Sequence, residues 1–348
     1  MKRFEALDGL RGVAALTVLL HHGLLLFPAL AAPYYSESIA APPAWWLVHT
    51  PLHVLWEGKA GVYVFFVLSG FVLTLPALDG RYRWASYYPS RLVRLYLPVW
   101  GAIALTLLTF AIVPRIANAV SPWLEERPRD VTLLRVIRDL TLVGGNGGLA
   151  SPLWSLTWEI LFSLALPLVI WTAVRLRRAH LLILGTSIIL VTVGGVLEES
   201  LLMYPPMFVV GVLLALRGDE VARWARRAHT WHWLLILVAA IIAVTSRWLL
   251  AGLGATEIIA DATAGLMLAG AAAFVVMALH WTAAERMLSA RPLRLVGIVS
   301  FSLYLVHEPL IVAAGFALPR APGLALAVAL IMTAAVTPLF YAIVERPS

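Results

Sequence analysis

The sequence predicts an all-α, polytopic membrane protein with about ten transmembrane helices around an internal polar cavity. Of its 348 residues, 61% are hydrophobic and only 13% are charged. Apolar stretches long enough to cross a bilayer follow one another along the chain, and most of the connections between them are short. Some of these stretches contain ionisable side chains, which indicates a polar interior because a charge is costly in lipid. Little sequence remains for a soluble domain, so we expect a single transmembrane domain over 1–348.

Each predicted span contains about 20 mostly apolar residues, the length that crosses the hydrocarbon core. The segments 181–197 and 201–216 are the shortest, and they form either two spans or one re-entrant pair. The ten segments are 5–27, 60–78, 95–113, 152–174, 181–197, 201–216, 231–250, 257–279, 296–316 and 322–343.

The placement of basic residues predicts the orientation in the membrane. Short cytoplasmic loops collect Lys and Arg, and most basic residues of this chain fall on the side that carries both of its ends. We therefore expect a multi-pass protein of the cell's inner (cytoplasmic) membrane with both termini in the cytoplasm. Orientation and contact with anionic lipid of the bilayer account for the net charge of +7, and no nucleic-acid partner is expected.

One long connection, about 114–151, is predicted to lie at the outer face. It contains the amphipathic stretch "TLLRVIRDLTLV" from Thr132 to Val143 and ends in the glycine cluster "GGNGG" at 144–148. Apolar residues at helical spacing predict a helix in this stretch. The helix either lies on the outer leaflet or acts as a lid over a site that faces outward.

Cysteine is absent, which excludes disulfides, thiolate metal sites and a cysteine-borne acyl intermediate. The adjacent His21 and His22 point about 100° apart on a helix, so they form a poor pair of metal ligands. No metal is predicted, and His21 is interpreted as structural.

The first predicted span carries aligned ionisable residues. Arg11 and His22 are eleven residues apart, about 20° beyond three helical turns, so both leave the helix on nearly the same face, about 16 Å apart along its axis. Asp8 lies three residues before Arg11 and can pair with it. Ionisable residues at membrane depth indicate a functional path or cavity. The alternatives are an Arg11 that snorkels to the interface and a His22 that makes a structural hydrogen bond.

Five motifs, in order along nearly the whole chain, resemble the membrane-bound acyltransferase 3 family. The first, "RGVAALTVLLHH", has the family's arginine, ten residues, histidine spacing. The others are "GVYVFFVLSGF" at 61–71, "SRLVRLYLP" at 90–98, "PLWSLTWEILFSLALP" at 152–167 and "FSLYLVHEPL" at 301–310. The resemblance implies a ten-helix fold that moves an acyl group from cytoplasmic acyl-CoA to a glycan, glycolipid or small glycosylated acceptor, commonly at the outer face. With acetyl-CoA as the expected co-substrate, the implied activity is O-acetylation of cell-envelope carbohydrate.

Ester formation from a thioester requires a base for the acceptor hydroxyl, and a neutral imidazole has a suitable pKa. His22 is the candidate general base. The phosphates of acyl-CoA require arginines, whose planar guanidinium groups bind phosphate oxygens in pairs. Arg91 and Arg94 correspond to the basic motif of the family, although Leu92 and Val93 stand between them, and we expect both to hold acyl-CoA together with Arg11. The alternative for Arg91 and Arg94 is ordinary cytoplasmic charge.

Ser155 and Glu159 are four residues apart and share one face of the span 152–174. Glu159 is predicted to orient His22, raise its basicity or hydrogen-bond the acceptor; the alternative is a structural pair with an arginine. Tyr304 and His307 share a face in the span 296–316, where they line the same cavity or belong to a structural network.

Ser69 and Gly70 of "LSGF" are interpreted as close helix packing. A serine nucleophile at Ser155, relayed by His22 or His307, is less favoured because the sequence lacks a nucleophile-elbow pattern. Direct transfer is therefore expected. A functional alternative is a polytopic transporter in which Arg11, His22 and Glu159 form a proton or solute path.

Overall fold

The structure, a computed structural model, describes residues 4–35, 39–80, 83–115, 121–143 and 147–348. These residues form helices and no strands, so the predicted all-α polytopic class is confirmed. Eight helical stretches are long and apolar enough to span a membrane, or ten if each of two bent helix pairs counts as one span. The eight stretches are α4 (Gly58–Leu78), α5 (Trp84–Ile112), α8 (Leu153–Arg175), Arg177–Val196 ending in α9 (His180–Val196), α13 (Thr230–Gly252), Glu257–His280 containing α14 (Glu257–Asp261) and α15 (Ala264–His280), α18 (Ser300–Ala317), and Pro322–Glu345 containing α19 (Pro322–Phe340).

Two helix pairs are bent, and one of them includes the segment 201–216, where the hydropathy pattern was ambiguous. Helix α1 (Glu5–Leu24) turns by 99° into α2 (Pro28–Tyr35), and Ser200–Leu216, which contains α10 (Ser200–Met203) and α11 (Pro205–Leu216), turns by 68° into α12 (Gly218–Ala225). Because Arg177–Val196 is long enough to span the membrane alone, the segment 181–197 does not need the next segment as a re-entrant partner.

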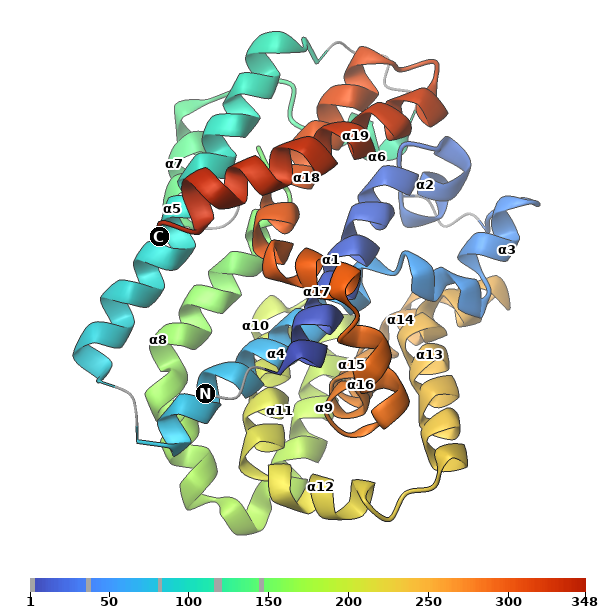
Figure 1. The fold of residues 1–348 in the computed structure, drawn as a ribbon. Helices are drawn as coiled ribbons and strands as arrows, with labels where there is room; N and C mark the ends of the chain where they lie inside the picture. The colour runs from blue at the N-terminus through green and yellow to red at the C-terminus, as the bar shows by residue number, and fades with distance from the viewer. Residues whose placement is uncertain (1–3, 36–38, 81–82, 116–120, 144–146) are drawn as a thin grey trace.

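Helices α1 and α18 form the centre of the bundle. In α18, 83% of the spanning window is buried, compared with 22% in Pro322–Glu345. Helix α1 packs against α4, α18 and α17 (Arg291–Ile298). Figure 1 shows α1 crossing the middle of the molecule, with α5 and α8 on one side and α13 on the other. The side chains on α1 and α18 are therefore enclosed by the bundle.

The bundle has two distinct ends (Figure 1). Helices α2 and α6 (Pro122–Glu125) lie at one end, which we call the loop end, and α12 lies at the other, the α12 end. The remaining short helices are α3 (Ala44–Val48), α7 (Leu133–Thr141) and α16 (Thr282–Leu288).

The amphipathic stretch of the long connection forms α7, as its periodicity predicted. Leu133, Leu134 and Ile137 are exposed, whereas Asp139 is fully buried. The Asp139 carboxylate accepts backbone N–H bonds from Gly147 at 2.6 Å and Leu149 at 3.0 Å, which ties α7 to the end of the connection. An apolar face directed outward favours the interfacial interpretation over the lid. Residues 144–146 of the glycine cluster lie outside the described residues.

Glycines bring α4 and α11 into close contact. A Cβ on Gly70 would overlap the carbonyl oxygen of Phe208, and a Cβ on Gly211 would overlap that of Val67 and lie 2.7 Å from the amide nitrogen of Phe71. Small residues let helix backbones approach each other in this way. The packing interpretation of Gly70 therefore agrees with the structure.

We expect Gly211→Ala to destabilise the protein by about 1–3 kcal/mol, because the added methyl group overpacks a backbone contact. The measurement is the thermal unfolding midpoint in detergent. Gly185→Ala is the matched control, since a Cβ at this helical position meets nothing within 4 Å. Equal midpoints for the two variants would contradict the close approach.

Candidate active site

A cavity of about 510 Å³ lies between α1, α4, α5, α8, α18 and the residues that follow α19. Among the described residues, its lining includes four guanidinium groups and two acidic side chains, Glu159 and Glu345. The arginines are Arg11, Arg91, Arg94 and Arg346. This excess of positive charge in a partly enclosed space is suited to an anionic ligand.

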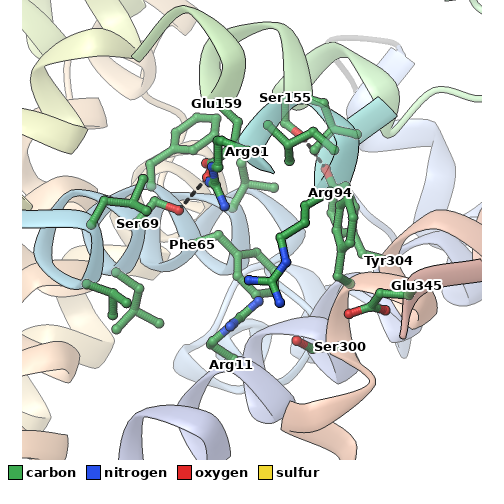
Figure 2. A pocket seen from close by; sticks show the side chains of 18 of the residues that line it. Arg11, Phe65, Ser69, Arg91, Arg94, Ser155, Glu159, Ser300, Tyr304 and Glu345 are labelled. Atoms are coloured by element: carbon green, nitrogen blue, oxygen red, sulfur yellow. Dashed lines mark hydrogen bonds and ion pairs between the residues drawn. The ribbon is translucent and has the colours of Figure 1, made fainter. Parts of the chain in front are cut away.

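Arg91 and Glu159 form an ion pair across the cavity, from α5 to α8. Ser69 donates a hydrogen bond to Glu159 Oε1 at 2.8 Å, and Arg91 Nε donates to Ser163 Oγ at 3.2 Å. Figure 2 shows the three side chains Ser69, Arg91 and Glu159 directed toward one another. These bonds hold the Arg91 guanidinium in one orientation at the cavity wall.

Two sequence-based expectations are corrected here. Glu159 was expected to support His22 or to hydrogen-bond the acceptor; its partners among the described residues are Arg91 and Ser69, the structural alternative considered above, and its side chain lines the cavity. Ser69 was assigned to helix packing, but its hydroxyl reaches into the cavity. Helical periodicity gives the face on which a side chain lies, and it does not identify the helix that this face meets.

Arg11 and Arg94 differ from Arg91 because neither makes a hydrogen bond or ion pair within the part of the chain that the structure describes. Helix α1 supplies Arg11 and α5 supplies Arg94, and Figure 2 shows both guanidinium groups directed into the same space. Asp8, Glu159 and Glu345 act on Arg11 only through longer-range electrostatics. The donors of these two arginines are therefore available to a ligand.

Helix α5 begins at Trp84, eleven residues before the predicted span 95–113. Arg91 and Arg94 therefore lie in the first half of this helix, three residues apart and on one face. The predicted span leaves out the helical turns from Trp84 to Arg94, because these residues are too polar for a lipid-spanning segment.

Ser155 and Tyr304 line the cavity and contact each other. Their hydroxyl oxygens are 2.8 Å apart, and each hydroxyl also lies within hydrogen-bonding distance of the Pro152 carbonyl, at 3.0 Å for Ser155 and 3.2 Å for Tyr304. Both side chains are buried. The structure thus brings Arg11, Arg91, Arg94, Ser155, Glu159 and Tyr304 to one cavity.

His22 and His307 lie behind this wall and do not line the cavity. Their rings are joined by a 2.9 Å contact between His22 Nδ1 and His307 Nε2. The ring centroid of His307 is 5.9 Å from that of Tyr304. Tyr304, which lines the cavity, therefore lies next to His307, and His307 is hydrogen-bonded to His22, but Arg11 and His22 do not share one open chamber as expected.

The long connection covers His22 from the loop end. Trp123 of α6 packs on the His22 ring with a centroid distance of 5.7 Å, and Ser121 donates a hydrogen bond to the carbonyl of Leu25. Arg127 forms a 3.4 Å ion pair with Glu308, which is buried beside His307 in α18. A short segment of the connection other than α7 thus closes over His22.

The remaining predicted residues lie away from the cavity. Asp8 does not line it, and the Asp8 carbonyl faces Gly297 of α17. His21 Nδ1 lies 3.1 Å from the Trp56 carbonyl, consistent with a structural role. Within the described ranges, no group of three or more His, Asp or Glu residues is arranged to hold a metal ion.

Sequence reasoning missed Arg346, Glu345, Trp123 and the Arg127–Glu308 pair. Glu308 carried a usable signal, because it is an acid inside a predicted span and such residues usually have a partner. Trp123 carried none, because a single tryptophan in a long connection does not indicate what it covers.

We expect Arg91→Met and Glu159→Met each to lower the unfolding free energy by about 1–2 kcal/mol, because each leaves one partly buried charge without its partner. The double variant should lose less than the sum of the two, as two interacting residues do in a double-mutant cycle. Thermal unfolding of the four proteins tests this, and strict additivity would contradict the pair.

Fold and site together define a polytopic α-helical membrane protein with an arginine-lined internal cavity and a histidine pair beside it. A family model described as an acyltransferase domain matches residues 4–344. The chain therefore belongs to the acyltransferase 3 family and is a membrane acyltransferase, as the five motifs predicted. Comparison with curated proteins and with solved structures gave no match.

Proposed function

We propose that this acyltransferase moves an acyl group, in the first instance acetyl, from acyl-CoA to a hydroxyl of a glycan, glycolipid or small glycosylated acceptor. The observation that carries the proposal is a polar path, by which we mean neighbouring polar side chains from the four-arginine cavity to His22: Tyr304 lines the cavity, its ring contacts that of His307, and His307 is hydrogen-bonded to His22. One end of this path suits a phosphate-bearing donor, and the other holds a base.

The arginines support acyl-CoA as the donor. Coenzyme A carries several phosphate charges, and guanidinium groups bind phosphate oxygens in bidentate pairs. Among the described residues nothing occupies the donors of Arg11 and Arg94, and Arg91 is fixed by Glu159 and Ser163. In the proposed complex these three, with Arg346, hold the nucleotide end of the donor, and the pantetheine arm extends toward Tyr304.

His22 is the proposed general base. Its neutral imidazole takes the proton from the acceptor hydroxyl as the oxygen forms a bond to the thioester carbonyl carbon. The carbon–sulfur bond then breaks, and the proton held by His22 passes to the departing thiolate, which gives free CoA and the ester product and returns His22 to its neutral form. General-base assistance of this kind contributes about 10²–10⁴-fold to a rate.

The contacts of Ser155 favour direct transfer over a covalent intermediate. A serine nucleophile needs a base within hydrogen-bonding reach. The partners of Ser155 Oγ are Tyr304 and the Pro152 carbonyl, and neither is a base of suitable pKa. Without an acyl-enzyme intermediate, the acyl donor and the acceptor must be bound to the enzyme at the same time.

The distribution of basic residues supports an orientation with the α12 end and both termini in the cytoplasm. In this arrangement acyl-CoA enters from the cytoplasm, and the acceptor reaches His22 from the outer face, past Trp123. The distance of about 16 Å along α1 between Arg11 and His22 matches the separation of a cytoplasmic nucleotide from a thioester in the outer half of the membrane. We place the protein in the inner (cytoplasmic) membrane, where both substrates meet it.

The test uses purified protein in detergent with acetyl-CoA labelled in the acetyl group and an extract of cell-envelope glycans as acceptor. Transfer of label to glycan, lost after mild base treatment, supports O-acetylation. Movement of label without loss from CoA would favour the transporter alternative, and transfer only from longer acyl-CoA would revise the acyl group. Mass spectrometry of envelope glycans with and without the gene then identifies the acceptor.

A further inference from the structure

His307 is the group to which His22 is most directly joined. It lies in α18, the most enclosed candidate span, and only 1% of it is exposed. Its Nδ1 is 3.0 Å from the carbonyl oxygen of Leu303, and its Nε2 is 2.9 Å from Nδ1 of His22. Both ring nitrogens of His307 are therefore occupied by protein groups, and neither is available to a substrate.

These two contacts fix where the protons lie. A carbonyl oxygen only accepts a hydrogen bond, so His307 Nδ1 must carry the proton that it donates to Leu303. In a neutral imidazole the second nitrogen is then an acceptor, so His307 Nε2 accepts a proton from His22 Nδ1. His22 consequently carries its proton on Nδ1, and the lone pair is on Nε2.

We propose that His307 is a positioning residue that holds His22 in the Nδ1–H tautomer with Nε2 as the basic atom. This inference rests on the proposed function of His22 as general base. In the opposite tautomer, Nε2 carries a proton and cannot take one from an acceptor hydroxyl. Trp123, packed on the same His22 ring, leaves the ring less freedom to turn.

The Leu303 carbonyl is the origin of this order. It lies one helical turn before His307 in α18, so the backbone of a buried helix sets the tautomer of His307, which in turn sets that of His22. A group that merely filled space at position 307 would leave only the Val18 carbonyl of α1, which also interacts with the His22 ring, to favour one tautomer. His307 donates to Leu303 and accepts from His22, and this order of donor and acceptor is what a positioning role requires and packing alone does not.

The chain contains an internal reference for the expected tautomer. His49 Nδ1 is 2.9 Å from the carbonyl of Trp248, and its Nε2 accepts the backbone N–H of Ala40 at 3.2 Å. His49 therefore carries its proton on Nδ1 for the same reason, and it does not line the cavity. Its ¹⁵N chemical shifts define the pattern that His22 should show.

The experiment is ¹⁵N NMR of the full-length protein in detergent with labelled histidine, with the His22 signals assigned by their loss in His22→Ala. In the wild type we expect the His49 pattern for His22. His307→Phe lacks the acceptor nitrogen and should give a mixture of His22 tautomers. We expect it to lower kcat about tenfold, the lower end of the loss caused by removing a hydrogen-bonded partner behind a functional histidine. Its affinity for CoA should be unchanged. His307→Gln places an amide oxygen near the position of Nε2 and should restore most of both.

A wild-type His22 with its proton on Nε2 would overturn the proposal, even if both variants failed to fold. Unchanged tautomer and kcat in a folded His307→Phe would do the same. Turnover that survives in His22→Ala is a separate outcome. It would show that His22 is not the base, and it would not change the tautomer measured in the wild type. The two failures are thus distinguishable.

Discussion

His22→Ala is expected to lower kcat for acyl transfer by about 10²–10⁴-fold, because the variant has no base at the end of the polar path. The affinity for CoA should stay unchanged, since His22 lies outside the arginine cavity. The effect should therefore appear in kcat and not in the dissociation constant of CoA. Steady-state transfer from labelled acetyl-CoA and equilibrium binding of CoA measure the two quantities separately.

His21→Ala is the matched control for this variant. His21 is the neighbouring residue on the same helix, but its ring contacts the Trp56 carbonyl and not His307. We expect its loss to affect stability and to leave turnover within a few-fold of wild type. If His22→Ala folds, binds CoA and still turns over at the wild-type rate, His22 is not the base.

Arg11→Gln is expected to weaken CoA binding roughly 30- to 150-fold. Hydrogen bonds to charged groups contribute about 1.5–3 kcal/mol each, and the guanidinium of Arg11 offers more than one donor to a phosphate. Within the described residues Arg11 has no hydrogen-bonded or ion-paired protein partner, so its removal leaves no buried carboxylate behind. The loss should therefore appear as weaker binding with a nearly unchanged unfolding midpoint.

Arg320→Gln provides a control of equal charge change. Arg320 is exposed and lies outside the cavity, so its variant should bind CoA like the wild type. Equal weakening by both variants would mean that general positive charge attracts the ligand, which would contradict a specific contact at Arg11. Measurements at two salt concentrations sharpen the comparison, because screening weakens long-range attraction more than a direct contact.

Most of the fold was predictable from sequence because lipid imposes length and apolarity on each span. The segment 231–250, for example, corresponds to α13 within two residues at each end. Helix α5 is longer than the predicted span, because its first turns are polar yet remain helical. The 99° bend after α1 was also missed, since hydropathy does not report the direction in which a helix continues.

For the site, the sequence predicts which side chains share one face of a helix, but not which side chains of other helices they contact. Arg11, Arg91 and Arg94 come from two helices, and the structure places them around one cavity, although their roles remain proposals. The partner of Glu159 was not predictable, because three arginines and a histidine were all plausible neighbours in sequence. Only the packing of α5 against α8 selects Arg91.

The four arginines of the cavity have a further consequence for turnover under the proposed function. They recognise the nucleotide end of the donor, and this end is chemically the same before and after the reaction. Spent CoA therefore competes with fresh acyl-CoA for the same guanidinium groups. The enzyme would respond to the ratio of acylated to free coenzyme in the cell, slowing when the acyl supply runs low even if total coenzyme is constant.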